Sequence, residues 1–149
     1  MRNFNRRETL ALGGAVSASF FCPPVLAQNR AQQIVGEFTG GKTPATGRME
    51  FEIPLVADNA NSVPVAVRVD SPMTVESYCS EVLILAEKNP RPRVCGFSFS
   101  PGISVPNFST RIRLAESQTV SVFAKMNDGS IFVARKSVTV TTGACAPSE

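Results

Sequence analysis

Histidine is absent from this 149-residue chain, and cysteine occurs only four times. Without an imidazole base, neither Ser-His-Asp nor Cys-His nucleophilic catalysis can be assembled. Blue-copper sites and most zinc sites also require imidazole ligands. The sequence shows no cofactor motif, no internal repeat and no low-complexity segment. These absences exclude most histidine-dependent enzymes and direct attention to the thiols.

The first 27 residues have the order of features that is typical of a twin-arginine export signal. Arg6-Arg7 precedes Leu10, and the apolar run over residues 10–22 is too short to span a bilayer, which takes about 20 residues. Pro23-Pro24 ends the run, and Ala27 supplies a small residue for cleavage. We therefore expect cleavage after Ala27, export to the periplasm and no remaining membrane span. A buried N-terminal helix is the alternative.

The chain without this predicted signal is almost neutral. Residues 28–149 carry 12 basic and 11 acidic side chains, which is not the basic footprint of a nucleic-acid-binding domain. Their 122 residues suffice for one domain that buries roughly two thirds of its surface. Because twin-arginine export usually carries folded proteins, sometimes with a bound companion, we expect an exported partner subunit.

Alternating apolar and polar residues predict about seven short strands after a short helix. The period of two at residues 48–56 and 63–70 is typical of half-buried strands. Residues 82–85 are all apolar, so their strand is expected to be covered on both faces. This pattern favours an all-β fold, an immunoglobulin-like antiparallel β-sandwich, with a barrel as the alternative. The helix is predicted at 28–37 and the strands at 48–56, 63–70, 78–86, 94–99, 109–114, 118–126 and 131–141.

Three cysteines remain once Cys22 is removed with the predicted signal, namely Cys79, Cys95 and Cys145. An odd number of cysteines in an exported protein indicates either intermolecular pairing or a free reactive thiol. The tail around Cys145 consists mostly of small residues and follows a strand-like run at residues 137–141. About four extended residues would let its sulfur lie roughly 13–14 Å from the strand. This favours a thiol presented to other proteins, and a frayed terminus is the alternative.

The other two cysteines are expected to form a disulfide. A hairpin around residues 87–92 would place Cys95 opposite Ile84 rather than Cys79, so a bridge requires the chain before the strand to fold over. We nevertheless expect a Cys79–Cys95 disulfide, which would remove two thiols that could attack Cys145. Closing a loop of about 15 residues would stabilise the fold by about 3 kcal/mol. Two separately buried cysteines are the alternative.

Four segments of the chain carry a resemblance to a known family. They are IPLVADNANSVPVAVRVDSPMT at 53–74, LAEKNPRPRVCGFSFSP at 85–101, STRIRLAESQTVSVFAKMNDGS at 109–130 and VTTGAC at 140–145. With the twin-arginine signal, they resemble SoxY, the sulfur-carrying subunit of the SoxYZ complex of bacterial thiosulfate oxidation. The resemblance extends over residues 36–143, which is nearly the whole of the chain after the predicted signal.

This resemblance implies a fold, a set of partners and a carrier residue. It implies an immunoglobulin-like sandwich that forms a heterodimer with SoxZ, and a flexible C-terminal arm of sequence Gly-Gly-Cys-Gly-Gly. The arm cysteine would carry thiosulfate-derived sulfur into the active sites of SoxAX, SoxB and the sulfane dehydrogenase. Cys145 matches the carrier cysteine by position, and Gly143 matches one flanking glycine. The protein would then be a carrier subunit without enzyme activity or a cofactor of its own.

The arm departs from the family pattern at several positions. Ala144 and Ala146 stand where glycines are expected, and alanine has less access to positive φ than glycine. Residues 147–149 replace the usual short glycine end. The departures leave open an alternative, a SoxY-like periplasmic interaction module that has lost or changed sulfur carriage. A thiol oxidoreductase is a weaker alternative, because the chain contains no Cys-x-x-Cys pair.

Overall fold

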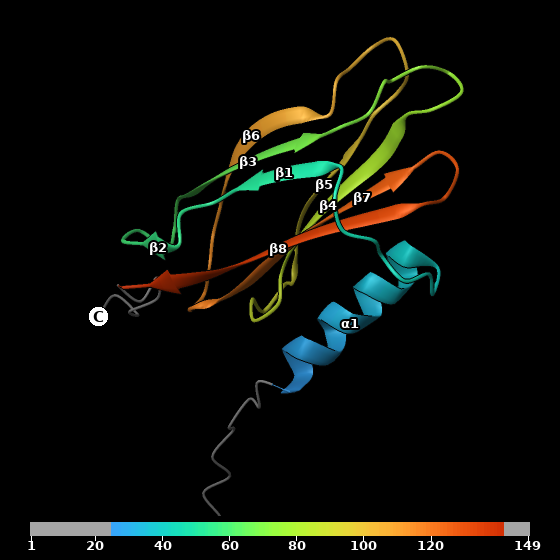
Figure 1. Cartoon of the computed structure of the whole chain (residues 1–149). Helices are drawn as coiled ribbons and strands as arrows, with labels where there is room; N and C mark the ends of the chain where they lie inside the picture. Colours follow the sequence, from blue (N-terminus) through green and yellow to red (C-terminus); the bar gives the residue numbers. More distant parts are fainter. Residues whose placement is uncertain (1–24, 142–149) are drawn as a thin grey trace, which may run out of the picture.

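The structure, a computed structural model, describes residues 25–141 and consists of one helix followed by eight strands (Figure 1). The helix confirms the predicted N-terminal helix and ends before Gly40 and Gly41, both at positive φ. The predicted cleavage point after Ala27 lies in its first turn, and residues 1–24 of the predicted signal lie outside the described part. The elements are α1 (Val25–Thr39), β1 (Met49–Glu52), β2 (Val56–Ala57), β3 (Val63–Val69), β4 (Cys79–Ala86), β5 (Arg93–Ser98), β6 (Asn107–Ile112), β7 (Gln118–Met126) and β8 (Ile131–Val140).

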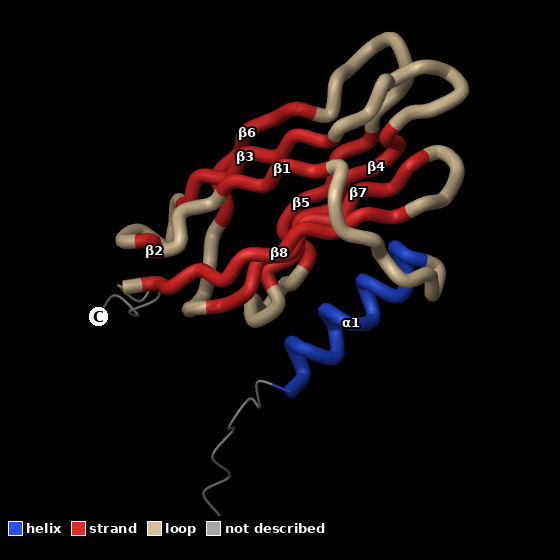
Figure 2. The backbone as a smooth tube through the Cα atoms, in the orientation of Figure 1, coloured by secondary structure: helices blue, strands red, loops and turns tan. Residues whose placement is uncertain are grey.

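Two sheets stack face to face (Figure 2). The smaller sheet has the order β1-β3-β6, and the larger has the order β2-β8-β7-β4-β5. All neighbouring strands are antiparallel except β2 and β8, which are parallel. The predicted immunoglobulin-like sandwich is therefore confirmed, and the alternative of a barrel is wrong.

The first predicted strand, at 48–56, is divided into β1 and β2. In the β1–β3 ladder Glu52 pairs with Ala66, so continuing the same register would place Pro54 opposite Pro64. Proline has no backbone N–H and cannot donate to a ladder. The β1–β3 ladder ends at Glu52, and the chain crosses to the other sheet, where it forms β2 beside β8.

The core between the sheets follows the alternation in the sequence. In β3 the valines at 63, 65, 67 and 69 are buried, whereas the residues between them are exposed or half-buried. They form one cluster with inward side chains of the larger sheet, among them Val82, Ile84, Val120 and Val122. Burial of these branched side chains is the main favourable contribution to folding, at about 25 cal/mol per Å² of apolar surface.

The outer face of the larger sheet is covered in part by α1 (Figure 1). Leu83, Leu85 and Phe123 are at most 1% exposed and form a second cluster with Phe38 of the helix. The rings of Phe38 and Phe123 are 6.3 Å apart between centroids. The prediction that the third expected strand is covered on both faces is thus confirmed. Within residues 25–141, no helix is long and apolar enough to cross a bilayer.

Phe38→Ala should destabilise the protein because it removes the aromatic contact between helix and sheet. We expect the free energy of unfolding, measured by urea denaturation, to fall by about 3 kcal/mol. The control is Gln33→Ala, which alters an exposed side chain bonded to Glu37 and should cost less than about 0.5 kcal/mol. Equal small effects of both variants would contradict the packing of α1 on the sheet.

Candidate functional site

The predicted carrier residue Cys145 and its neighbours Gly143, Ala144 and Ala146 lie outside the described residues. What the structure describes is the strand that leads to them, β8, up to Thr141. The candidate site is therefore built from the end of β8 and from the surface around it.

The end of β8 is held on both sides by backbone hydrogen bonds. On one side, Val140 N donates to Ser117 Oγ at 2.8 Å. On the other side, Thr139 N donates to Leu55 O at 2.8 Å, and Thr141 N donates to Ala57 O at 3.2 Å. The last residues of β8 are thus bonded to β2 on one side and to the Ser117 side chain on the other, beyond the end of the β7–β8 ladder at Val138.

The side chain of Thr141 adds a further anchor. Its Oγ1 donates to Asp58 Oδ1 at 3.1 Å and lies 3.5 Å from Ala57 O. Two bonds from the backbone and hydroxyl of one residue thus fix the point from which the chain continues toward Cys145. A site borne on a rigid element is positioned more precisely than one borne on a loop.

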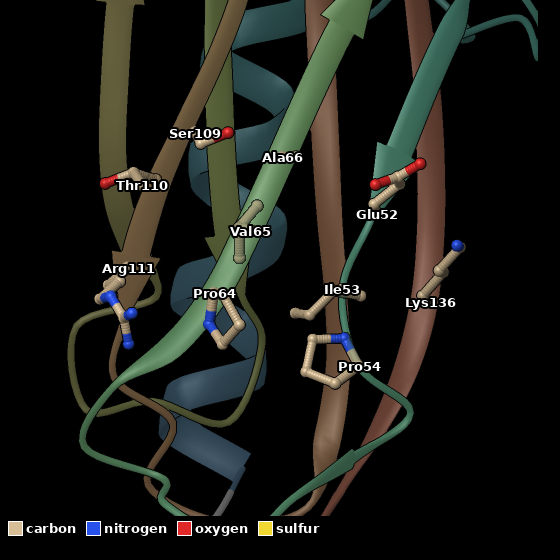
Figure 3. A pocket seen from close by; sticks show the side chains of 10 residues that line it. All are labelled: Glu52, Ile53, Pro54, Pro64, Val65, Ala66, Ser109, Thr110, Arg111 and Lys136. Atoms are coloured by element: carbon tan, nitrogen blue, oxygen red, sulfur yellow. The ribbon is translucent and has the colours of Figure 1, made fainter.

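A groove lies between β3, β6 and the Ile53-Pro54 link, which precedes the segment that anchors β8 (Figure 3). It has a volume of about 660 Å³, and the rings of Pro54 and Pro64 border it. The groove exists because the two prolines cannot continue the β1–β3 ladder, so the strands separate at this point. The sequence reasoning did not find it, although both prolines were visible within predicted strands.

Two cations stand on opposite sides of the groove, Arg111 and Lys136 (Figure 3). Arg111 Nη1 donates to Ser62 Oγ at 3.1 Å, and Lys136 Nζ lies 6.0 Å from the centroid of the Phe51 ring. The hollow between them is lined by apolar side chains of Ile53, Pro54 and Pro64, and the carboxylate of Glu52 also lines it, near Lys136 (Figure 3). Other basic residues point elsewhere, since Arg93 pairs with Glu81 at 3.6 Å and Arg135 lies over Phe123.

The predicted Cys79–Cys95 disulfide is wrong for this structure, because both cysteines are free thiols. Cys95 pairs with Ile84 across the β4–β5 ladder, as the hairpin reasoning required. Cys79 lies five residues before Ile84 in β4, which is a distance of roughly 16 Å at the rise of a strand. A disulfide requires Cα atoms within about 7 Å. Cys79 is itself the first residue of β4. Its position is therefore fixed by the strand, and a fold in the chain before β4 would not bring it closer to Cys95.

The described thiols are poor nucleophiles. Cys79 is completely buried in the core, and this burial raises the pKa of its thiol to about 11. Cys95 is half-buried at the edge strand β5, and burial raises the pKa of its thiol as well. Because the thiolate is the reactive form, neither suits sulfur chemistry near neutral pH. Within residues 25–141, no group of three or more carboxylates and thiols is placed to hold a metal ion.

The fold defines an immunoglobulin-like domain. Because none of the described residues is an activated thiol, the candidate reactive residue is Cys145, which follows β8 in the sequence. The sequence profile described as Sulfur oxidation protein SoxY matches residues 35–145. Because this match covers most of the chain and reaches Cys145, the protein belongs to the SoxY family. No curated protein matches the sequence.

Solved structures with a similar fold include a sulfur carrier protein and superoxide reductases. The sulfur carrier protein SoxY from Chlorobium limicola f thiosulfatophilum has a TM-score of 0.64 at 21% identity, covering 78% of this chain and 96% of that chain. A superoxide reductase (neelaredoxin) from Ignicoccus hospitalis has a TM-score of 0.57 at 20% identity, covering 64% and 81%. A putative superoxide reductase from Thermotoga maritima has a TM-score of 0.56 at 18% identity, covering 70% and 91%. At these identities the similarity shows the fold alone.

The raised pKa of Cys79 predicts a loss of stability at alkaline pH. The folded state keeps this thiol protonated up to about pH 11, whereas the unfolded chain ionises near 9.0. The contribution of this thiol to stability should therefore be constant below pH 9 and fall as the pH rises to 11, by up to about 3 kcal/mol at about 1.4 kcal/mol per pKa unit. Denaturation of Cys79→Ala should show a correspondingly shallower alkaline slope. An identical slope in the variant and the wild type would contradict the burial effect. Gln33→Ala, which changes no titratable group, serves as the control.

Thiol labelling should reveal two protected cysteines in the native protein. With iodoacetamide at pH 8 and peptide mapping, Cys79 should remain unlabelled until the protein is unfolded, because its sulfur is inaccessible and protonated. Cys95 should react slowly. A recovered peptide pair joined by a Cys79–Cys95 disulfide would contradict the free thiols of the structure.

Proposed function

We propose that this protein is a periplasmic covalent sulfur carrier of thiosulfate oxidation, with the intermediate held on Cys145. The observation that supports it most is the family match, which runs to residue 145 and therefore includes the position of the carrier cysteine. The related protein from Chlorobium is itself described as a sulfur carrier. The protein would reach the periplasm by the twin-arginine route, in a heterodimer with a SoxZ-like subunit.

The geometry at the end of β8 supports this role. A carrier thiol must be presented from a fixed base, and the bonds of Thr141 to Ala57 and Asp58 provide one. A competing thiol nearby would capture the activated sulfur by exchange. The two described cysteines are withdrawn from such reactions by burial rather than by a disulfide.

The loading step is an oxidative conjugation. The thiolate sulfur of Cys145 forms a bond to the sulfane sulfur of thiosulfate, giving a cysteine S-thiosulfonate. The thiol loses one proton, and two electrons pass to an electron-accepting partner enzyme, for which SoxAX is the candidate. SoxB and the sulfane dehydrogenase would then process the bound sulfur. The protein is the tethered substrate in these steps, so its own residues supply presentation rather than catalysis.

A second candidate is an interaction module that keeps the fold and the SoxZ-like contact without carrying sulfur. Ala144 and Ala146 favour it, because they replace the glycines expected beside the carrier cysteine. Alanine restricts the backbone at those positions and adds bulk to a segment that must enter an active site.

Replacing Cys145 separates these two functions. In a reconstituted mixture of the heterodimer, thiosulfate and the SoxAX-type enzyme, the wild type should gain a mass that a reductant removes. Cys145→Ser should gain none, because the acceptor sulfur is missing. Cys95→Ser is the matched control and should be loaded like the wild type. Loading of Cys145→Ser equal to that of the wild type would overturn the carrier proposal, and absence of loading in the wild type would favour the interaction module.

A further inference from the structure

Two large apolar side chains beside the end of β8 are exposed to solvent. Leu55 is 66% exposed and Val56 is 54% exposed, although valine and leucine are among the residues most often buried in proteins. Both belong to the short segment that pairs with Thr139 of β8. The preceding residue, Pro54, borders the groove (Figure 3), so the two exposed side chains directly follow part of the groove's lining.

We propose that this surface, defined by Leu55, Val56 and the Pro54–Pro64 groove, is where the receiving enzymes dock when they take up Cys145. The inference rests on the proposed function and deepens it by assigning the contact surface. The occupant is a protein that presents an apolar side chain, bordered by carboxylates, next to the mouth of its active site. The apolar side chain fits the groove and Leu55, and the carboxylates face Arg111 and Lys136.

The length of chain between the anchor and the thiol favours contact at this surface. Cys145 lies four positions after Thr141, and four residues span at most about 13–14 Å. Val56 pairs with Thr139, two residues before Thr141, which places its Cα roughly 8 Å from that of Thr141. A protein that encloses Cys145 in an active site therefore lies within roughly 22 Å of Val56, near enough for its surface to extend over Leu55 and Val56.

The position of β2 in the sheet explains why this surface can receive a partner. β2 is the edge strand of the larger sheet, and its neighbours Leu55 and Ala57 direct their carbonyls toward β8. An exposed apolar edge is a hazard that proteins usually cover or protect with charge. Leu55 and Val56 lie at this edge, next to the anchor of the carrier segment, where an enzyme that takes up Cys145 would cover them.

Other exposed apolar side chains lie too far away to take part. Val75, Ile103 and Val105 are 76%, 85% and 68% exposed, and they lie in the β3–β4 and β5–β6 loops, at the other end of the sandwich (Figure 1). The β3–β4 loop is tied to the β7–β8 turn, where Tyr78 N donates to Asn127 Oδ1. The ten residues of β8 separate the two ends, which is roughly 30 Å. These residues offer matched controls of the same chemistry and exposure.

The test compares two double variants of the full heterodimer. Leu55→Ser with Val56→Thr removes the apolar contact while keeping a β-branched residue in β2, and Val75→Thr with Ile103→Ser is the control. Each is first checked for folding and for binding to the SoxZ-like subunit. The initial rate at which the SoxAX-type enzyme loads Cys145 with thiosulfate is then measured against carrier concentration.

We expect the Leu55/Val56 variant to show a KM for the carrier about tenfold higher than the wild type, and the control to match the wild type. The reaction of Cys145 with a small thiol reagent should be the same in all three proteins. An unchanged KM in the Leu55/Val56 variant would overturn the docking surface while leaving the carrier function intact. Loss of SoxZ-like binding in this variant would also overturn it, by assigning the surface to the permanent partner. A wild type that is not loaded at all would remove the proposed function itself.

Discussion

The inability of two prolines to pair across a β ladder determines how this molecule is built around its carboxyl end. Pro54 and Pro64 would face each other if β1 and β3 continued in register, and neither has an N–H to donate. The chain leaves the smaller sheet at that point and pairs with β8 of the larger one. That crossing gives β8 a neighbour on its open side, separates the strands to form the groove, and leaves Leu55 and Val56 exposed.

The proposed carrier function has two requirements. The thiol must reach other proteins, and the point of the fold from which it extends must be rigid. The end of β8 meets the second requirement through bonds from both sides, which include those of Thr141 to Ala57 and Asp58. The tether is short, so whatever encloses the thiol lies close to the surface around the base. Leu55 and Val56, the exposed apolar side chains beside the end of β8, lie on this surface. The anchor of β8 and the exposed positions of Leu55 and Val56 thus both follow from a single strand crossing.

Much of this architecture was predictable from the sequence, because local patterns report local environments. Alternating valines identified β3, the unbroken apolar run identified β4 as doubly covered, and hairpin counting placed Cys95 opposite Ile84. The division of the strand predicted at 48–56 depends on which residue faces Pro54, and this is a non-local fact that periodicity does not contain. The disulfide prediction failed for a related reason. It gave more weight to the chemistry of exported cysteines than to the register, which keeps Cys79 and Cys95 far apart.

The most direct test of the central claim is the intact mass of the protein from cells grown on thiosulfate, before and after reduction, with mapping of the tail peptide. The account predicts a sulfur-containing adduct that a reductant removes and that maps to Cys145. It also predicts unmodified thiols at Cys79 and Cys95. A Cys145 that remains bare, or that carries only random oxidation under these conditions, would contradict sulfur carriage and favour the interaction module.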